Sequence, residues 1–114
     1  MHTLHNQACE ACQNSSTALT DDEARTLLRQ LPQWTIIDDH GVKKLQRVYC
    51  FADFAGALAF ANRIAGLAEQ ENHHPALLTE WGKLTVSWWT HRISGLQRTD
   101  FILAARCDRL LPLD

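Results

Sequence analysis

No apolar run in the sequence approaches the roughly 18 residues that a membrane-crossing helix requires, so we expect no membrane span. The chain also lacks an excess of basic residues, because its net charge is −2. That balance argues against a protein that binds nucleic acid through a dense basic surface. Residues 1–7 hold neither a basic stretch nor an apolar stretch, which argues against a secretory signal. We therefore expect a cytoplasmic protein.

The residues that are present fit one globular domain. The chain has 114 residues, of which 46% are hydrophobic and 21% are charged. This length leaves no room for two full cores, and this composition is not that of a disordered chain. Residues 1–19 are polar and rich in Asn, Gln, Ser and Thr, which predicts a flexible N-terminal arm. Residues 20–114 are expected to form a single domain.

The arm contains a C-x-x-C pair, Cys9 and Cys12, close to His2 and His5. These four side chains could bind zinc tetrahedrally. Few apolar residues nearby could pack around such a site, so a plain polar arm is the simpler interpretation. Cytosolic thiols normally stay reduced, and no disulfide framework is expected.

The hydrophobic pattern of the remaining chain predicts the order α-β-β-α-β-β-α. Four strands in two hairpins, together with three helices, indicate an α+β fold with a four-stranded antiparallel sheet. The expected elements are a helix that begins at a Thr20–Glu23 capping box and ends at Pro32, strands at 34–37 and 42–49, a helix at 53–71, strands at 77–81 and 83–90, and a helix at 97–110.

Apolar spacing also predicts which residues are buried. Trp34, Trp88, Cys50 and Cys107 are expected in the core. One face of the last strand is expected to carry Leu84, Val86, Trp88 and Thr90, and the other Lys83, Thr85, Ser87, Trp89 and His91. The long helix is expected to bury a stripe made of Phe54, Ala57, Leu58, Ala61, Ile64, Ala65 and Ala68.

Half of the six histidines lie where regular elements end. His73 and His74 follow the long helix and precede Pro75, and His91 ends a strand. Functional side chains are often displayed at such positions. Glu69 lies one helical turn before His73, where its carboxylate could orient an imidazole. A solvated corner without function and a three-histidine metal site are the alternatives, although adjacent imidazoles tend to point apart.

A longer motif contains these histidines. The segment from Glu69 to Pro75, followed by Trp81, Thr90-His91 and Asp100, resembles the signature of the pterin-4a-carbinolamine dehydratases. The resemblance covers roughly residues 20–111, and the runs 79–83 and 88–91 look most like bacterial members.

The resemblance implies an enzyme that converts a 4a-hydroxytetrahydropterin to the quinonoid dihydropterin and water. Such an enzyme recycles the pterin of an aromatic amino acid hydroxylase and uses no metal or other cofactor. The catalytic residues that it implies are His73, His74, His91 and Glu69. The residues expected to bind substrate are Asn72, Thr90 and Asp100, together with Trp89, which lies on the His91 side of its strand.

Histidine suits this reaction, because a hydroxyl must gain a proton and a ring N–H must lose one. An imidazole with an ordinary pKa of about 6.5 serves both directions. We expect His73 and His91 to exchange these protons, His74 to orient the pterin, and Glu69 to support one imidazole.

The main alternative to a dehydratase is a protein-binding module. The resemblance implies it too, since animal members also act as transcription coactivators. Ala55, Ala57, Ala59 and Ala61 give the long helix a surface that permits close approach. We expect a homodimer or homotetramer, because a four-stranded sheet with helices on one face leaves an edge or a face to cover.

Overall fold

The computed structural model describes residues 4–6 and 17–111, and these form an α+β fold with the predicted order of helices and strands. Two short 3-10 turns are added to that order. The elements are η1 (Leu4–Asn6), α2 (Asp21–Leu28), β1 (Thr35–Asp39), β2 (Val42–Cys50), α3 (Phe54–Glu71), β3 (Ala76–Glu80), β4 (Lys83–Trp88), η2 (His91–Ile93) and α4 (Arg98–Arg109).

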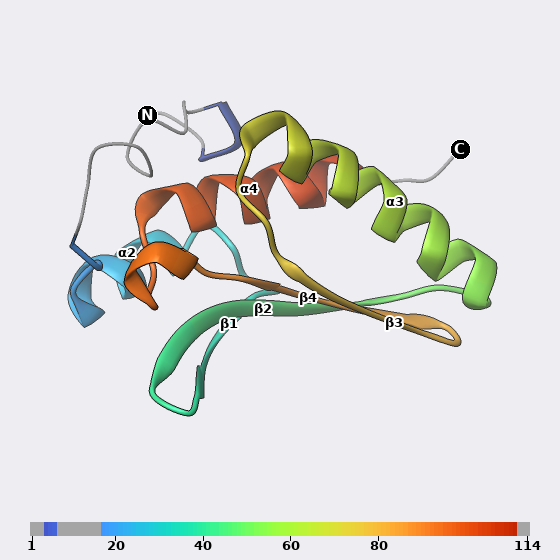
Figure 1. Ribbon diagram of the computed structural model, residues 1–114. Helices are drawn as coiled ribbons and strands as arrows, with labels where there is room; N and C mark the ends of the chain where they lie inside the picture. The colour runs from blue at the N-terminus through green and yellow to red at the C-terminus, as the bar shows by residue number, and fades with distance from the viewer. Residues whose placement is uncertain (1–3, 7–16, 112–114) are drawn as a thin grey trace.

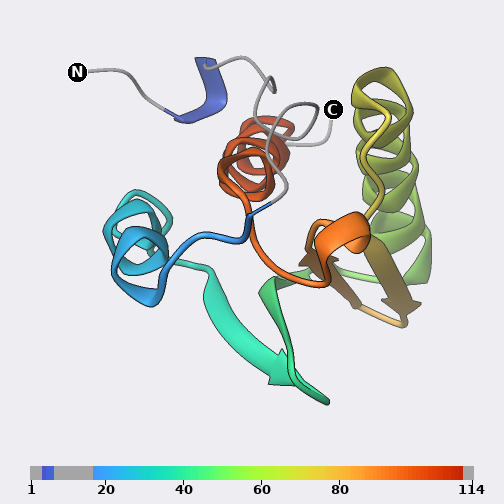
Figure 2. The same cartoon turned by 60° about the vertical axis from the view of Figure 1, so that its left-hand side comes forward.

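The four strands form one antiparallel sheet in the order β1-β2-β4-β3. The helices α3 and α4 lie across one face of this sheet, and the described residues place no helix on the other (Figure 1). A view along α4 shows it between α2 and α3 (Figure 2). The first hairpin turns at His40 and Gly41, whose φ angles are both positive, as the favoured two-residue hairpin turn requires.

The predicted helix starts are confirmed at α2 and α3. Thr20 and Glu23 form the expected capping box, and the Asp53 side chain accepts from the Gly56 N–H at 2.8 Å. The α3 helix ends at Asn72, which adopts the left-handed conformation with φ 51° and donates its N–H to the carbonyls of Ala68 and Glu69. This reversal directs His73 and His74 towards β3.

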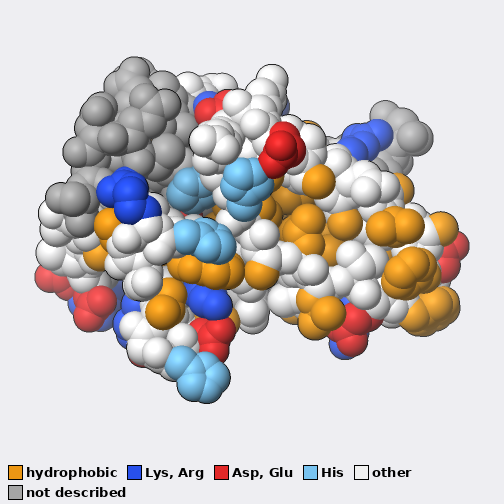
Figure 3. Space-filling model, in the orientation of Figure 1, with side chains coloured by type: hydrophobic (Ala, Val, Ile, Leu, Met, Phe, Trp, Pro, Cys, Tyr) orange, Lys and Arg blue, Asp and Glu red, His pale blue; other side chains and the backbone are white. Residues whose placement is uncertain are grey.

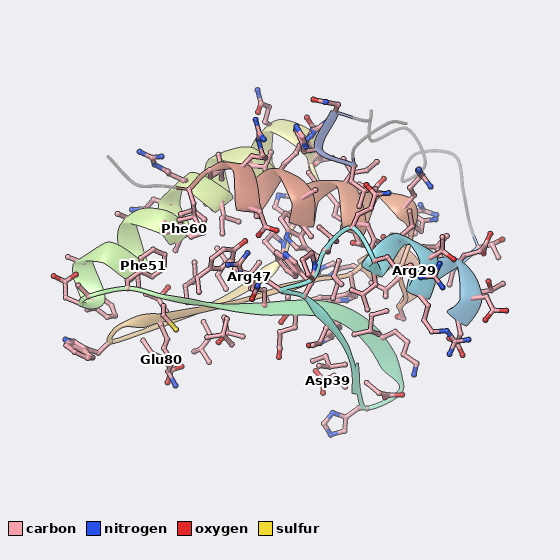
Figure 4. All side chains as sticks on the ribbon, turned by 180° about the vertical axis from the view of Figure 1, so that it is seen from behind. Arg29, Asp39, Arg47, Phe51, Phe60 and Glu80 are labelled. Carbon is pink, nitrogen blue, oxygen red and sulfur yellow. The ribbon has the colours of Figure 1, made fainter. Side chains whose placement is uncertain are left out.

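The core lies between the sheet and the helices. Its sheet side comes from Leu84, Val86 and Trp88, as predicted, and Trp34 is buried as well. Figure 4 shows the side chains of this layer from behind, with Phe60 between α3 and the sheet. Phe60 was not in the predicted stripe.

Two burial predictions are wrong. The buried face of α3 is Ala57, Phe60, Ala61, Ile64 and Ala68, whereas Phe54, Leu58 and Ala65 are exposed. Apolar residues surround this helix, and only one side rests on the sheet, so periodicity alone selects a stripe that is too broad. Cys107 is buried as expected, but Cys50 is exposed. Cys50 shares the uncovered face of the sheet with Val48, two residues before it.

The last strand is also shorter than predicted. It ends at Trp88, Thr90 forms only an isolated bridge to Gly95, and His91 begins η2. The Thr90 N–H donates to the Gly95 carbonyl at 2.8 Å, which closes a tight loop. This loop turns His91 out of the strand and towards the end of α3.

Part of the predicted arm lies against the domain. In η1 the Leu4 side chain is buried against α4, and the Arg106 side chain donates to the His5 carbonyl at 3.1 Å. Cys9, Cys12 and His2 lie outside the described residues, so the zinc alternative and the boundary of the arm stay predictions. No described helix combines the length and the apolar character needed to cross a membrane.

Candidate active site

A cavity of about 520 Å³ opens where the end of α3, the end of β4 and η2 meet. This volume lies in the range typical of small-molecule sites. Histidine side chains gather on the same face of the molecule (Figure 3). The lining residues are Glu71, Asn72, His73, His74, Thr90, His91 and Arg92. The cavity thus brings together the three predicted histidines and two of the four predicted substrate-binding residues.

His73 is the buried histidine of the site, with 7% of its surface exposed. Its Nε2 lies 2.7 Å from Oδ1 of Asp100. Since a carboxylate oxygen only accepts, Nε2 carries the proton. The ring also stacks on Trp88, with centroids 5.9 Å apart. A carboxylate at one edge and an indole at one face together fix the orientation of this imidazole.

Asp100 is fully buried behind His73 and does not line the cavity. Its Oδ2 accepts from the Thr90 hydroxyl and from the Gln97 N–H, each at 2.8 Å. The Gln97 contact is part of the capping box that begins α4. The structure therefore places this residue, which was expected to bind substrate, where it holds His73 and Thr90.

His74 follows His73 but turns towards solvent. Its Nε2 lies 2.5 Å from Oε2 of Glu69, on the last turn of α3. The expected contact between Glu69 and an imidazole is therefore present, and it is made with His74. Both side chains are at least half exposed, so solvent screens the pair.

Among the described residues, no carboxylate lies within hydrogen-bond distance of the His91 ring. Its Nε2 lies 2.9 Å from the His74 backbone oxygen. A carbonyl oxygen only accepts, so Nε2 is again the protonated nitrogen. The ring stacks on Trp89, with centroids 4.2 Å apart and planes 21° from parallel. Trp89, expected to wall the substrate, is thus placed against His91 rather than among the lining residues.

The three imidazoles share one pattern, because each commits its Nε2 to an oxygen acceptor. In the neutral tautomer that this fixes, Nδ1 carries the lone pair. Such rings can take up and return protons at Nδ1. Within residues 4–6 and 17–111, no group of three His, Cys, Asp or Glu side chains has an arrangement suited to a metal ion.

Two lining residues were not predicted, Glu71 and Arg92. Oε2 of Glu71 pairs with Nη1 of Arg106 at 3.2 Å, which ties the end of α3 to α4. Glu71 lies inside the motif from Glu69 to Pro75 but was given no role there, and the sequence signal for Arg92 was its position directly after His91.

The fold and the cavity define a class of protein, namely a small α+β domain with a histidine-lined cavity at one end of its sheet. Within that class, residues 17–110 match the sequence model of the pterin 4 alpha carbinolamine dehydratase family. The chain belongs to this family.

Two relatives are similar over nearly the whole chain, and both are named "Putative pterin-4-alpha-carbinolamine dehydratase". The protein from Marinobacter nauticus is 52% identical over 96% of this chain and 99% of its own length. The protein from Chlorobaculum tepidum is 49% identical over 97% of this chain and 100% of its own length.

Solved structures agree on the fold. A transcriptional coactivator/pterin dehydratase from Brucella melitensis superimposes with a TM-score of 0.75 at 29% identity, over 82% of this chain and 98% of that one. A pterin dehydratase-like protein identified as a RuBisCO assembly factor in the alpha-carboxysome has a TM-score of 0.57 at 20% identity, over 68% of this chain and 88% of that one. The second likeness is one of fold alone.

Proposed function

We propose that the protein dehydrates a 4a-hydroxytetrahydropterin to the quinonoid dihydropterin. Membership of the family supports the substrate class. The observation that carries the proposal is that His73 and His91 line one cavity, each with its Nε2 already bonded. A loss of water by general acid and general base requires two positioned groups that can give and take protons, and an imidazole can fill either role.

In the proposed step, one imidazolium gives a proton to the C4a hydroxyl, the C–O bond breaks and water leaves. The lone pair of the neighbouring ring nitrogen forms the C=N bond, and the second imidazole takes the N–H proton. One histidine ends neutral and the other protonated, and exchange with solvent restores both. The reaction needs no net oxidant, reductant or metal.

We assign the acid to His73 and the base to His91. When the buried His73 ring holds a second proton, the Asp100 carboxylate compensates its charge, as in other carboxylate–histidine pairs. His91 donates only to a neutral carbonyl, so its neutral form presents the Nδ1 lone pair.

The other predicted residues take supporting roles. We propose that His74, steadied by Glu69, orients the pterin ring, and that Asn72 and Thr90 contact it, since both line the cavity. Trp89 and Asp100 act through the histidines that they touch. The expected homodimer or homotetramer, the cytoplasmic location and the link to an aromatic amino acid hydroxylase belong to the same proposal.

Single variants His73→Ala and His91→Ala test the proposal. Each should slow the loss of freshly generated 4a-carbinolamine by roughly 10²–10⁴-fold, the usual contribution of a positioned acid or base. His40→Ala is the matched control, because His40 is exposed at the β1–β2 turn and should keep full activity. Full activity in both site variants would exclude the mechanism.

A protein-binding role is the second candidate. Phe54, Leu58, Leu78 and Trp81 are large apolar side chains that remain exposed on α3 and on the second hairpin. Exposed apolar groups of this kind often mark contact surfaces. Wild-type protein that fails to accelerate carbinolamine loss would favour this role over the dehydratase.

A further inference from the structure

His91 differs from the other two histidines in what holds it. His73 and His74 are each hydrogen-bonded to a carboxylate. The described contacts of His91 are a hydrogen bond to a backbone oxygen and a stacking contact with the Trp89 ring. His91 is also exposed. A single hydrogen bond leaves a ring free to rotate about that bond, so the orientation of the imidazole plane depends on Trp89.

Trp89 in turn lies against Lys44. The β2–β4 register pairs Leu45 with Trp88, and one further step of that antiparallel register places Lys44 opposite Trp89. The ammonium Nζ lies 4.0 Å from the centroid of the Trp89 ring. A cation at this distance over an indole is attracted by the electrons of the ring. Lys44 therefore fixes the tryptophan on which His91 stacks.

Lys44 is itself firmly placed. Only 16% of its side chain is exposed, and Nζ lies 2.7 Å from Oδ2 of Asp39. This hydrogen bond lowers the pKa of the Asp39 carboxyl and keeps it charged as a partner. Asp39 ends β1 and lies beside the turn of the first hairpin, as Figure 4 shows. The contacts thus run from Asp39 through Lys44 and Trp89 to His91.

We propose that Lys44 is a positioning residue for His91 and that it acts through Trp89. The first hairpin, which does not line the cavity, thereby sets the plane of one imidazole. The consequence for catalysis rests on the proposed function above, while the consequence for the His91 ring does not. Loss of the Lys44 charge should let Trp89 move and should leave His91 with a range of ring orientations.

The experiment compares Lys44→Met with Lys44→Arg and with Lys43→Met as the matched control. Arginine keeps a cation that stacks on indole. Lys43 is an exposed neighbour that pairs with Asp38 at 3.5 Å rather than with Trp89. The first measurement is the proton NMR shift of the His91 ring, which the Trp89 ring current displaces. We expect this displacement to shrink in Lys44→Met and to persist in the other two variants.

The second measurement is dehydratase kinetics with the same variants. In Lys44→Met we expect kcat to fall about fivefold to tenfold with KM within about twofold, since cation–π contacts are of this strength. An unchanged His91 shift in Lys44→Met would overturn the positioning role. A changed His91 shift with an unchanged kcat in Lys44→Met would show that Lys44 positions His91 but does not contribute to catalysis. Wild-type protein without activity would reject the proposed function and leave the NMR result to decide the positioning.

Discussion

The two ends of α4 carry carboxylates with similar surroundings and different consequences. Near the start of the helix, Asp100 accepts from His73, Thr90 and the Gln97 backbone. Eight residues later, Asp108 accepts from three side chains of the first hairpin and the segment before it. Each carboxylate gathers three donors and joins separate parts of the chain.

The donors around Asp108 are Trp34, Arg47 and Tyr49, and Arg47 also lies over the Tyr49 ring. Figure 4 shows Arg47 between the sheet and the helical layer. None of these residues lines the histidine cavity. At both ends of α4 a carboxylate with three donors joins separate segments of the chain. Asp100 is fully buried whereas the Asp108 side chain is 27% exposed, and only Asp100 has a donor, His73, that also lines the cavity.

The largest effect is expected from Asp100→Asn. The amide nitrogen would face donors, and the negative charge opposite His73 would be lost. We expect kcat/KM for carbinolamine dehydration to fall at least about 100-fold, the lower end of what a positioned acid or base contributes. Steady-state kinetics of the folded variant, verified by circular dichroism, measures this. Activity within about threefold of wild type would show that His73 does not need its carboxylate.

Asp108→Asn is the matched variant at the other end of the helix. The same loss of charge and of acceptor capacity should lower the free energy of unfolding by about 2 to 3 kcal/mol, as expected for hydrogen bonds to a charged group. The wild-type Asp108 side chain is 27% exposed, so solvent weakens its interactions and the expected loss stays moderate. Urea unfolding gives the stability, and kcat/KM should stay within about twofold. A large loss of activity without a loss of stability in Asp108→Asn would contradict the prediction that Asp108 supports the fold and not the reaction.

A smaller effect is expected from alkaline pH. Burial and the neighbouring Asp108 raise the pKa of the Tyr49 hydroxyl, and burial raises the pKa of the Cys107 thiol. In the unfolded chain both groups ionise at ordinary values, so the stability that they contribute is present at neutral pH and is lost as the pH rises above about 9 to 10.

Tyr49→Phe should make this decline shallower, by up to about 1.4 kcal/mol per pH unit above pH 10. Urea unfolding at intervals from pH 8 to pH 11 measures the slope. The dehydratase activity of this variant at neutral pH should match that of wild type. An unchanged slope would show that Tyr49 ionises as readily in the folded protein as in the unfolded chain.

The sequence predicted the order of elements because each signal was local. Thr20 with Glu23, and Asp53 before a long apolar stretch, mark helix starts that the structure confirms. The three histidines were predicted from their place at the ends of elements. The family resemblance and the cavity agree on the same three residues.

What the sequence missed depends on contacts between distant segments. The spacing of α3 could not show that Phe60 faces the sheet while Leu58 faces solvent. Nothing near Asp100 in the chain indicates that His73 lies 2.7 Å away, since 27 residues separate them. The register that sets Lys44 beside Trp89 is likewise a property of the assembled sheet.

The left-handed backbone at Asn72 restricts how this cavity can be redesigned. A side chain other than Gly, Asn or Asp in that conformation costs roughly 1 to 2 kcal/mol, and Asn72 is also a lining residue. A library that randomises the cavity to accept other substrates should therefore recover few replacements at position 72. Variation in ligand preference is more accessible at Arg92, which lies in the short turn η2 and has an ordinary backbone.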